Sequence, residues 1–190
     1  DLSRRDFTIN AIVMDRNGTI YDPFSGREDI THKKIRTVGR AQDRFKEDPL
    51  RMLRGIRFAV KYGFEISYNT RIAMIACAPL LMQVSVERIF SELKQIVQHG
   101  DNVLRLMEMC GVLQIVIPEL MVMKDYEQNN PHHSLDLMKH TERVMYNVDG
   151  IEMKLAAMFH DAGKPACKSY ANYTIAHYYG HASVSTDIAR

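Results

Sequence analysis

The chain has 190 residues, of which 46% are hydrophobic and 25% charged, a composition typical of a globular protein rather than a disordered or fibrous one. No stretch approaches about 18 consecutive apolar residues, and the first residues do not resemble a secretory signal, so we expect neither a membrane-spanning helix nor a membrane partner. The three distant cysteines fit no metal-ligand spacing and indicate reduced thiols in a cytoplasmic protein: Cys77, Cys110 and Cys167.

The positive charge is unevenly distributed along the chain. Residues 1–60 hold 13 Lys and Arg against 9 Asp and Glu, whereas residues 61–190 hold 12 against 14. A basic first third suits a partner that is rich in phosphate. A solvated basic surface gives the same count, so charge alone does not decide between the two interpretations.

The first 40 residues predict short β-strands. Residues 7–14 show a two-residue alternation, residues 16–19 have the composition of a hairpin turn, and residues 20–22 and 35–38 resume the strand pattern. From residue 43 onward the apolar spacing is helical. The expected helices are 44–62, 68–78, 86–98, 101–110, 134–147, 151–163 and 173–190. We therefore expect an α+β fold that is mainly α, with a linker at residues 125–131.

The segment from Phe45 to Phe58 is the most informative of these helices. At about 100° per residue, one stripe holds Glu47, Arg51, Arg54 and Phe58, with Asp48 at its edge. The opposite side should face the core and holds Leu50, Leu53, Ile56 and Val60. The polar stripe is either a surface with ion pairs such as Glu47–Arg51 or a face that reads a ligand.

Hydrogen-bond arithmetic makes the ligand-reading alternative concrete. A carboxylate only accepts hydrogen bonds and a guanidinium only donates them. Side by side, Asp48 and Arg51 match a base edge that offers an amino donor beside a ring-nitrogen acceptor. Cytosine and adenine present that pattern, whereas guanine and uracil present the reverse. Such a pair selects C and A without a template strand, because unpaired base edges are open to side chains.

The same string resembles the Glu-Asp-x-x-Arg motif of class II tRNA nucleotidyltransferases, the CCA-adding enzymes, and of bacterial poly(A) polymerases. The resemblance implies that Asp48 and Arg51 read CTP or ATP and that Glu47 supports Arg51. Arg54 shares the polar stripe and is expected to bind nucleotide with them.

Residues 1–11 resemble another motif of this family nearly position for position. Adjacent arginines before a strand can hold triphosphate oxygens, because guanidinium groups suit bidentate contacts to phosphate. The nucleotide-binding residues implied here are Arg4, Arg5, Asp6 and Asn10. The alternative is a strand start with solvated arginines.

Two further segments resemble family motifs. Residues 22–29 match one in which two glycines are usual where this chain has Ser25 and Gly26, and we expect a structural loop there. Residues 84–89 match the motif that follows the base-reading helix. Ser85 is expected to cap the next helix. Glu87 and Arg88 are expected to brace Arg51 or its neighbours.

Nucleotidyl transfer in this superfamily uses two divalent metals on carboxylates of a Gly-Ser loop and an Asp-x-Asp strand, which precede the arginine motif. The sequence starts after that point, and Asp1 cannot replace those carboxylates. We therefore expect an internal portion of a longer enzyme, with no catalytic residue in it and with the Mg²⁺ ligands of the polymerase site outside it. These residues alone are expected to be inactive.

A second candidate metal site lies in the last third of the chain. Residues 130–141 and 158–165 resemble an HD domain, which gathers a His from one helix and a His-Asp pair from the next around a metal. The implied ligands are His140, His160 and Asp161, a set that suits a transition metal. The fourth ligand stays open: it is Asp187, His133, His177 or His181, or it lies beyond Arg190.

The resemblance implies three segments. Residues 1–40 would end a nucleotidyltransferase head, residues 41–124 would form a helical neck and body, and residues 125–190 would begin an HD domain. The implied reaction adds CMP and AMP to a tRNA 3′ end from CTP and ATP with Mg²⁺. A metal-dependent phosphohydrolase and a non-catalytic RNA-binding remnant are the alternatives. The sequence does not separate CCA addition from C-only, A-only or poly(A) synthesis, and it gives no oligomeric state.

Overall fold

The structure of the chain is a computed structural model that describes residues 2–100, 102–127, 136–172 and 175–190. Its α-helices are α1 (Gly26–Thr31), α2 (Ala41–Glu47), α3 (Arg51–Tyr62), α4 (Tyr68–Cys77), α5 (Val86–His99), α6 (Val103–Met109), α7 (Leu113–Val116), α8 (Leu137–Tyr146), α9 (Ile151–Phe159) and α10 (His181–Ile188). Short 3-10 helices are η1 (Leu2–Arg4), η2 (Thr8–Asn10), η3 (Ala78–Gln83), η4 (Pro118–Met123) and η5 (Pro165–Cys167). The strands are β1 (Val13–Met14), β2 (Ile20–Tyr21), β3 (Lys34–Ile35), β4 (Glu65–Ile66), β5 (Ser169–Asn172) and β6 (Ile175–His177).

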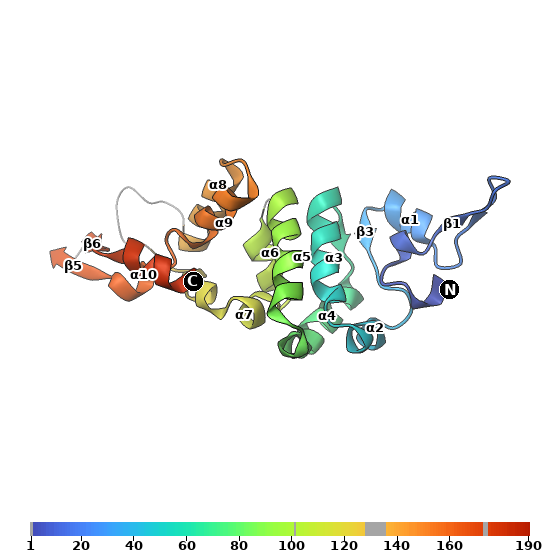
Figure 1. Cartoon of the computed structure of the whole chain (residues 1–190), viewed down its shortest axis with the longest axis horizontal. Coiled ribbons are helices and arrows are strands. Elements are labelled where there is room, and N and C mark those ends of the chain that lie inside the picture. Colours follow the sequence, from blue (N-terminus) through green and yellow to red (C-terminus); the bar gives the residue numbers. More distant parts are fainter. Residues whose placement is uncertain (1, 101, 128–135, 173–174) are drawn as a thin grey trace.

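The molecule is elongated, with the N-terminal segment at one end and β5, β6 and α10 at the other (Figure 1). Helices α3 and α5 pack side by side in the middle, and α8 packs on α9. Strand pairs β1–β2 and β5–β6 are antiparallel, whereas β3 and β4 are parallel. No helix in the described residues is long and apolar enough to cross a membrane. The expected α+β, mainly α fold is confirmed.

The core joins the N-terminal segment to α3, which decides where the first candidate site forms. Phe7 is fully buried and belongs to one hydrophobic cluster that runs on through α3 and α5 as far as Ala162. Gly55 permits this contact, because a Cβ there would lie 2.8 Å from the Phe7 ring and 2.6 Å from the Met74 methyl. The residues just before Phe7 are therefore held beside the start of α3.

The predicted strand over residues 7–14 is wrong for most of its length. Residues 8–10 form η2, Phe7 makes an isolated bridge with Thr37, and only Val13 and Met14 lie in a strand, β1. The reason is tertiary: the buried Thr8 hydroxyl donates to Asp29, and its amide donates to the carbonyl of Arg36. The hairpin turn at residues 16–19 is confirmed by the pairing of β1 with β2.

The predicted helix over residues 44–62 is interrupted between α2 and α3. Asp48 has φ −150° and ψ 102°, an extended conformation, because the ring of Pro49 disfavours the helical region for the residue before it. Asp48 is thus not on one continuous helical stripe with Arg51. Phe58 is also buried in the core rather than exposed on the polar face, whereas Leu50, Leu53 and Ile56 face the core as expected.

The structure also tests the last predicted helix and the predicted cap at Ser85. The predicted helix over residues 173–190 is wrong in its first part, which contains β6, and right in its last part, α10. Ser85 stands at the N-cap of α5, but its side chain makes no capping hydrogen bond. Part of the expected linker, residues 128–131, lies outside the described residues, and so does the candidate ligand His133.

Candidate functional site

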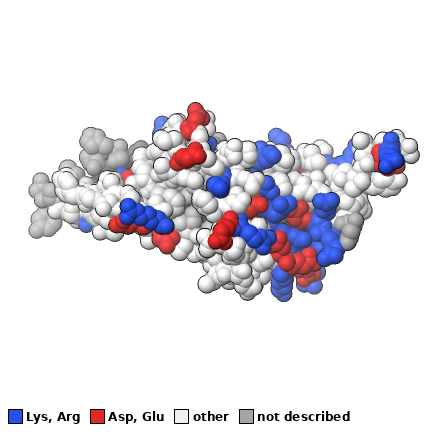
Figure 2. Space-filling view, in the orientation of Figure 1, with Lys and Arg blue, Asp and Glu red and all other residues white. Residues whose placement is uncertain are grey.

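A cavity of about 290 Å³ lies where the N-terminal segment meets the start of α3 and α5. It is lined by Arg4, Arg5, Asp6, Asp48, Leu50, Arg51, Arg54 and Arg88. Five guanidinium groups face two carboxylates, so the cavity is strongly positive and suits a polyphosphate. Figure 2 shows basic side chains, with acidic ones among them, gathered over this end of the molecule.

The back of the cavity is held by an ion pair between Asp6 and Arg54. Nη2 of Arg54 lies 2.7 Å from Oδ2 of Asp6, and Nε donates to the same oxygen at 2.8 Å. The other carboxylate oxygen accepts from Asn10 Nδ2 at 3.1 Å and from the amide of Phe7 at 2.8 Å. Burial alone would raise the pKa of Asp6, but the hydrogen bonds from Asn10 and Arg54 outweigh it and lower that pKa. Asp6 is therefore ionised and links the N-terminal segment to Arg54.

Arg51 is oriented by three acceptors around its guanidinium. Nη1 donates to Glu47 Oε2 at 2.8 Å, and Nη2 donates to the carbonyl of Arg4 at 3.1 Å. Nη1 also lies 3.4 Å from the carbonyl of Arg44. Arg44 in turn donates to the other oxygen of Glu47 and to the carbonyl of Ser3. Glu47 thus contacts Arg51 as expected, and the contribution of Arg44 was missed, although its position three residues before Glu47 signals an ion pair.

Asp48 is held by Arg88 from the neighbouring helix. Nη2 of Arg88 lies 3.4 Å from Oδ1 and 3.3 Å from Oδ2, and Oδ1 also accepts from the amide of Leu50 at 3.2 Å. Arg88 therefore braces a neighbour of Arg51 and lines the cavity itself. The exposed Glu87 has no hydrogen-bond or ion-pair partner among the described residues.

Both members of the expected base-reading pair retain unused hydrogen-bonding capacity. A carboxylate has about four acceptor positions and a guanidinium five donors, so the contacts above leave Asp48 able to accept and Arg51 able to donate. Both side chains line the same cavity. Asn10 and Glu47 do not line it; they act on it through Asp6 and Arg51.

The charge of this cavity argues against a divalent cation bound by its own residues. Asp6 is committed to Arg54, and Asp48 is adjacent to Arg88. Metal ions need clustered oxygen ligands, which two separate, arginine-paired carboxylates do not supply. The residues present do not fit a catalytic Mg²⁺ site.

The second candidate site forms where α8 meets the end of α9. Ligand atoms of His140, His160 and Asp161 lie within 4.8 Å of one another. Nε2 of His160 is 3.1 Å from Asp161 Oδ2, and Nε2 of His140 is 3.5 Å from the same oxygen. The three residues implied by the HD resemblance therefore converge.

Two further side chains converge on Asp161. His181, from α10, places Nε2 3.4 Å from Oδ1, and Lys164 places Nζ 2.8 Å from Oδ2. Burial alone would raise the pKa of Asp161, but hydrogen bonds with His160 and Lys164 hold it well below its ordinary value. The participation of Lys164 was missed, and its position one helical turn after Asp161 is the signal that could have found it.

The imidazole tautomers favour a cation at this cluster. Nδ1 of His160 lies 2.7 Å from the carbonyl of Ala157, and Nδ1 of His181 lies 2.7 Å from that of Tyr178. A carbonyl only accepts, so both Nδ1 atoms carry hydrogen, and in the neutral rings Nε2 presents a lone pair to the Asp161 carboxylate. Two lone pairs repel unless a proton or a metal lies between them. The hydrogen bond with Asp161 accordingly raises the pKa of His160.

Two of the other fourth-ligand candidates, Asp187 and His177, are not at the cluster. Asp187 is exposed and lies 3.4 Å from Arg190, and His177 stacks on Tyr179 with ring centroids 5.4 Å apart. Of the candidates that the structure describes, only His181 contacts Asp161. The donor set fits a transition metal.

Comparisons with known proteins relate most of the chain to one family. Residues 1–36 match a family model described as "Poly A polymerase head domain". Residues 63–124 match one described as "Probable RNA and SrmB- binding site of polymerase A". The two models together span more than half of the chain.

Individual relatives agree with these models. The CCA-adding enzyme of Geobacillus thermodenitrificans is 54% identical over 96 residues, which are 50% of this chain and 24% of that enzyme, so the chain spans about a quarter of this curated relative. The crystal structure of the Bacillus stearothermophilus CCA-adding enzyme in complex with CTP is 34% identical with a TM-score of 0.58, covering 88% of this chain and 38% of that one. The Thermotoga maritima CCA-adding enzyme complexed with tRNA-CCA is 25% identical with a TM-score of 0.62, covering 84% and 39%. The chain belongs to the family of CCA-adding enzymes and poly(A) polymerases.

Proposed function

We propose that this chain is the nucleotide-selecting and RNA-contacting part of a template-independent nucleotidyltransferase that adds CMP and AMP to tRNA 3′ ends. One observation carries the proposal: a single positive cavity brings together Arg4 and Arg5, from the N-terminal segment, with Asp48 and Arg51. The relatives solved with CTP and with tRNA-CCA support CTP, ATP and tRNA as its partners. The cytoplasm is the proposed location.

In this proposal the arginines of the N-terminal segment bind the triphosphate. Arg5 is exposed, and its side chain has no partner in the described part of the chain. The ion pair of Asp6 with Arg54 fixes the backbone that carries Arg4 and Arg5. Because that backbone is fixed, the two guanidinium groups bind phosphate oxygens without a further loss of backbone entropy.

Asp48 and Arg51 read the base. Arg51 is oriented by Glu47 and by the carbonyl of Arg4, and Asp48 by Arg88 and by the amide of Leu50. Asp48 accepts from the exocyclic amino group of cytosine or adenine, and Arg51 donates to the adjacent ring nitrogen. Guanine and uracil place a donor against Arg51 and an acceptor against Asp48, so they are rejected.

No step of nucleotidyl transfer is assigned to these residues, because the cavity does not fit the catalytic metals. We propose that carboxylates outside residues 1–190 bind Mg²⁺ at the polymerase site. The three segments 1–40, 41–124 and 125–190 remain our proposal for the head, the neck and body, and the HD-type unit.

Binding of the four nucleoside triphosphates by isothermal titration calorimetry tests the proposal. Wild type should bind CTP and ATP more tightly than GTP and UTP. Hydrogen bonds to charged groups contribute about 1.5–3 kcal/mol, so Asp48→Ala and Arg51→Ala should each weaken CTP and ATP binding by roughly tenfold to a hundredfold. Asp149→Ala and Arg16→Ala remove exposed charges elsewhere and should change nothing. Retained selectivity in both site variants would contradict the base-reading role.

A second function, metal-dependent phosphohydrolysis, is favoured by the convergence of His140, His160 and Asp161. We propose that these three residues, with His181, bind one transition metal. A bound metal would supply an activated water and charge neutralisation for a phosphate ester. Asp161 and His160 would fix its geometry, with the carbonyl of Ala157 setting the ring orientation of His160. Elemental analysis of chelator-free protein should detect metal in wild type and lose it in His160→Ala.

A further inference from the structure

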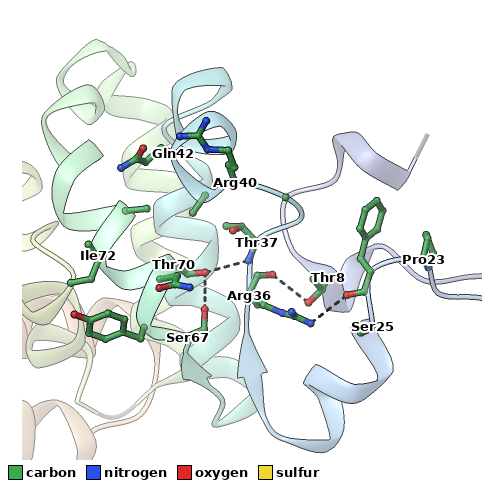
Figure 3. Close-up of a pocket in the computed structure, with 16 residues that line it drawn as sticks. Thr8, Pro23, Ser25, Arg36, Thr37, Arg40, Gln42, Ser67, Thr70 and Ile72 are labelled. Atoms are coloured by element: carbon green, nitrogen blue, oxygen red, sulfur yellow. Dashed lines mark hydrogen bonds between the residues drawn. The ribbon is translucent and has the colours of Figure 1, made fainter.

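A groove of about 800 Å³ separates the loop before α1 and the segment after β3 from the first turn of α4. Figure 3 shows Arg40 and Gln42 at one end of it, and Arg36, Thr37, Ser67 and Thr70 along its length. It shares no lining residue with the cavity of Arg5 and Arg51. Its α4 side falls within residues 63–124, which match the RNA-binding family model, but none of its lining residues is among the predicted nucleotide-binding residues.

The groove is positive, and its two charged lining residues are both arginines. Not one of its 16 lining residues is acidic. Arg36 is partly neutralised, because Nε donates to Asp29 at 2.8 Å and Nη2 lies 3.4 Å from the carbonyl of Phe24. Arg40 is 80% exposed, and Asp43, outside the groove, is 3.9 Å from its Nε. Arg40 is therefore available to an anion.

The groove also receives the N-terminus of α4, a helix of 10 residues. The N-cap residue Ser67 makes no capping hydrogen bond and donates instead to Thr70 Oγ1 at 2.9 Å. The amides of Tyr68, Asn69 and Thr70 donate to no acceptor in the described part of the chain. The positive end of the helix dipole therefore adds to the field of Arg36 and Arg40.

An exposed aromatic ring completes the groove. Tyr68 is 68% exposed and lines it, with the guanidinium carbon of Arg71 6.0 Å from the ring centroid. An aromatic face beside a positive groove is the arrangement by which proteins stack a base while they bind its phosphate. Gln42 and Asn69 add amide groups that can both donate and accept hydrogen bonds.

We propose that this groove binds a phosphorylated ribonucleoside unit. Its phosphate would interact with Arg40 and with the amides at the start of α4, and its base would stack on Tyr68. The same chemistry is offered by a free nucleotide and by one unit of a single RNA strand. The site is additional to the base-reading cavity, and the proposal does not depend on the function assigned to that cavity.

The test is a titration of the isotope-labelled protein followed by amide chemical shifts. AMP, a tetra-adenylate and inorganic phosphate are added separately. Saturable shifts of the amides of residues 68–70 and of Gly39 are expected with AMP or tetra-adenylate. Shifts of the Arg51 and Arg54 amides report the other cavity in the same spectra. AMP and the tetra-adenylate are compared at the same concentration of nucleotide units. If AMP saturates the site as well as the tetra-adenylate does, the ligand is a free nucleotide. If the tetra-adenylate binds more tightly, the ligand is an RNA strand.

Two exposed substitutions localise the site. Arg40→Ala should weaken the binding seen at residues 68–70 by about fivefold, and Tyr68→Ala by at least that much. Neither should alter binding at Arg51. Arg16→Ala and Tyr146→Ala remove an exposed arginine and an exposed tyrosine elsewhere and should leave both unchanged. The proposal is overturned if AMP and tetra-adenylate give no saturable shift at residues 68–70, or if both groove variants bind like wild type.

Discussion

Arg54 donates two hydrogen bonds to a single carboxylate oxygen of Asp6, with Nε at 2.8 Å and Nη2 at 2.7 Å from Oδ2. The side chain of Asp6 is 7% exposed and that of Arg54 is 35% exposed. The pair links the N-terminal segment to α3 immediately behind the cavity that Arg5 and Arg51 line. Its position lets one contact stabilise the fold and also place the arginines that we propose to bind phosphate.

Substituting Arg54→Ala should destabilise the protein, because it leaves the buried carboxylate of Asp6 without its cation. Hydrogen bonds to charged groups contribute about 1.5–3 kcal/mol, and the partial exposure of Arg54 keeps the expected loss within that range. Chemical denaturation should show a loss of that size, whereas Arg16→Ala, which removes an exposed arginine, should stay near wild type. If the double variant Asp6→Asn/Arg54→Ala regains the stability of wild type, the isolated charge of Asp6 is the cause of the loss. If the double variant is as unstable as Arg54→Ala, the cause is lost packing of the Arg54 stem.

The pH dependence of stability should carry a signature of Asp6. Its pKa is lower in the folded state than the ordinary value of 3.8. A carboxyl with a depressed folded pKa contributes stability that is fully present above its unfolded pKa and is lost as the pH falls through the folded pKa. Unfolding free energies measured from pH 6 down to pH 2 should therefore decline less steeply below about pH 4 in Asp6→Asn than in wild type. Parallel curves would show that Asp6 does not contribute to acid unfolding.

At the first candidate site, the sequence predicted the residue types but not the backbone conformation that positions them. Paired donors and acceptors at Asp48 and Arg51 follow from side-chain chemistry, and both residues line one cavity. Their spatial relation does not follow from a helical wheel, because Pro49 interrupts the helix and leaves Asp48 extended. The helical wheel therefore did not predict the break before α3.

Partners that are distant in sequence were named from the family resemblance and not from local periodicity. Arg88 reaches Asp48 from α5, and His181 reaches Asp161 from α10, which periodicity alone does not reveal. The strand predicted at residues 7–14 failed for a similar reason, since hydrogen bonds from Thr8 to Asp29 and Arg36 override its local preference. Local patterns predicted most helices because those signals lie within one or two turns.

Arg88→Ala should reduce base selectivity with little effect on stability. The contacts of Arg88 with Asp48 are long, at 3.3 and 3.4 Å, and its side chain is 55% exposed, so the pair contributes at most about 1 kcal/mol to folding. Its loss frees the Asp48 carboxylate to rotate, while the amide of Leu50 still restrains one oxygen. Preference for CTP over UTP should fall by less than in Asp48→Ala. An equal fall would indicate that Arg88 contacts the nucleotide directly.

His181→Ala should weaken binding of a transition metal at the second site. His181 Nε2 lies 3.4 Å from Asp161 Oδ1, and its Nδ1 is engaged with the carbonyl of Tyr178, as in histidines that bind a metal through the other nitrogen. Titration of Zn²⁺ against a chelator of known affinity should show a loss of about tenfold or more. His177→Ala is the matched control, because that ring stacks on Tyr179. Equal affinity in His181→Ala and wild type would remove His181 from the ligand set.

Lys164→Met should strengthen metal binding at the same cluster. The Lys164 ammonium lies 2.8 Å from Asp161 Oδ2, and its side chain is 9% exposed, so in the absence of metal it compensates the buried carboxylate. A divalent cation bound by Asp161 would be repelled by this ammonium, and two unit charges about 4 Å apart interact by several kcal/mol at an effective dielectric constant of 20. Methionine keeps much of the length of the side chain and removes the charge, so the affinity for Zn²⁺ should rise by at least about tenfold.

The metal-free Lys164→Met variant should be less stable than wild type, because Asp161 loses its compensating charge. Added Zn²⁺ should therefore raise the melting temperature of this variant more than that of wild type. Lys168→Met removes a nearby lysine that instead contacts the ring of Tyr126, and it should leave the affinity unchanged. A lower affinity in Lys164→Met, with the fold intact, would show that Lys164 positions Asp161 for the metal rather than competing with it.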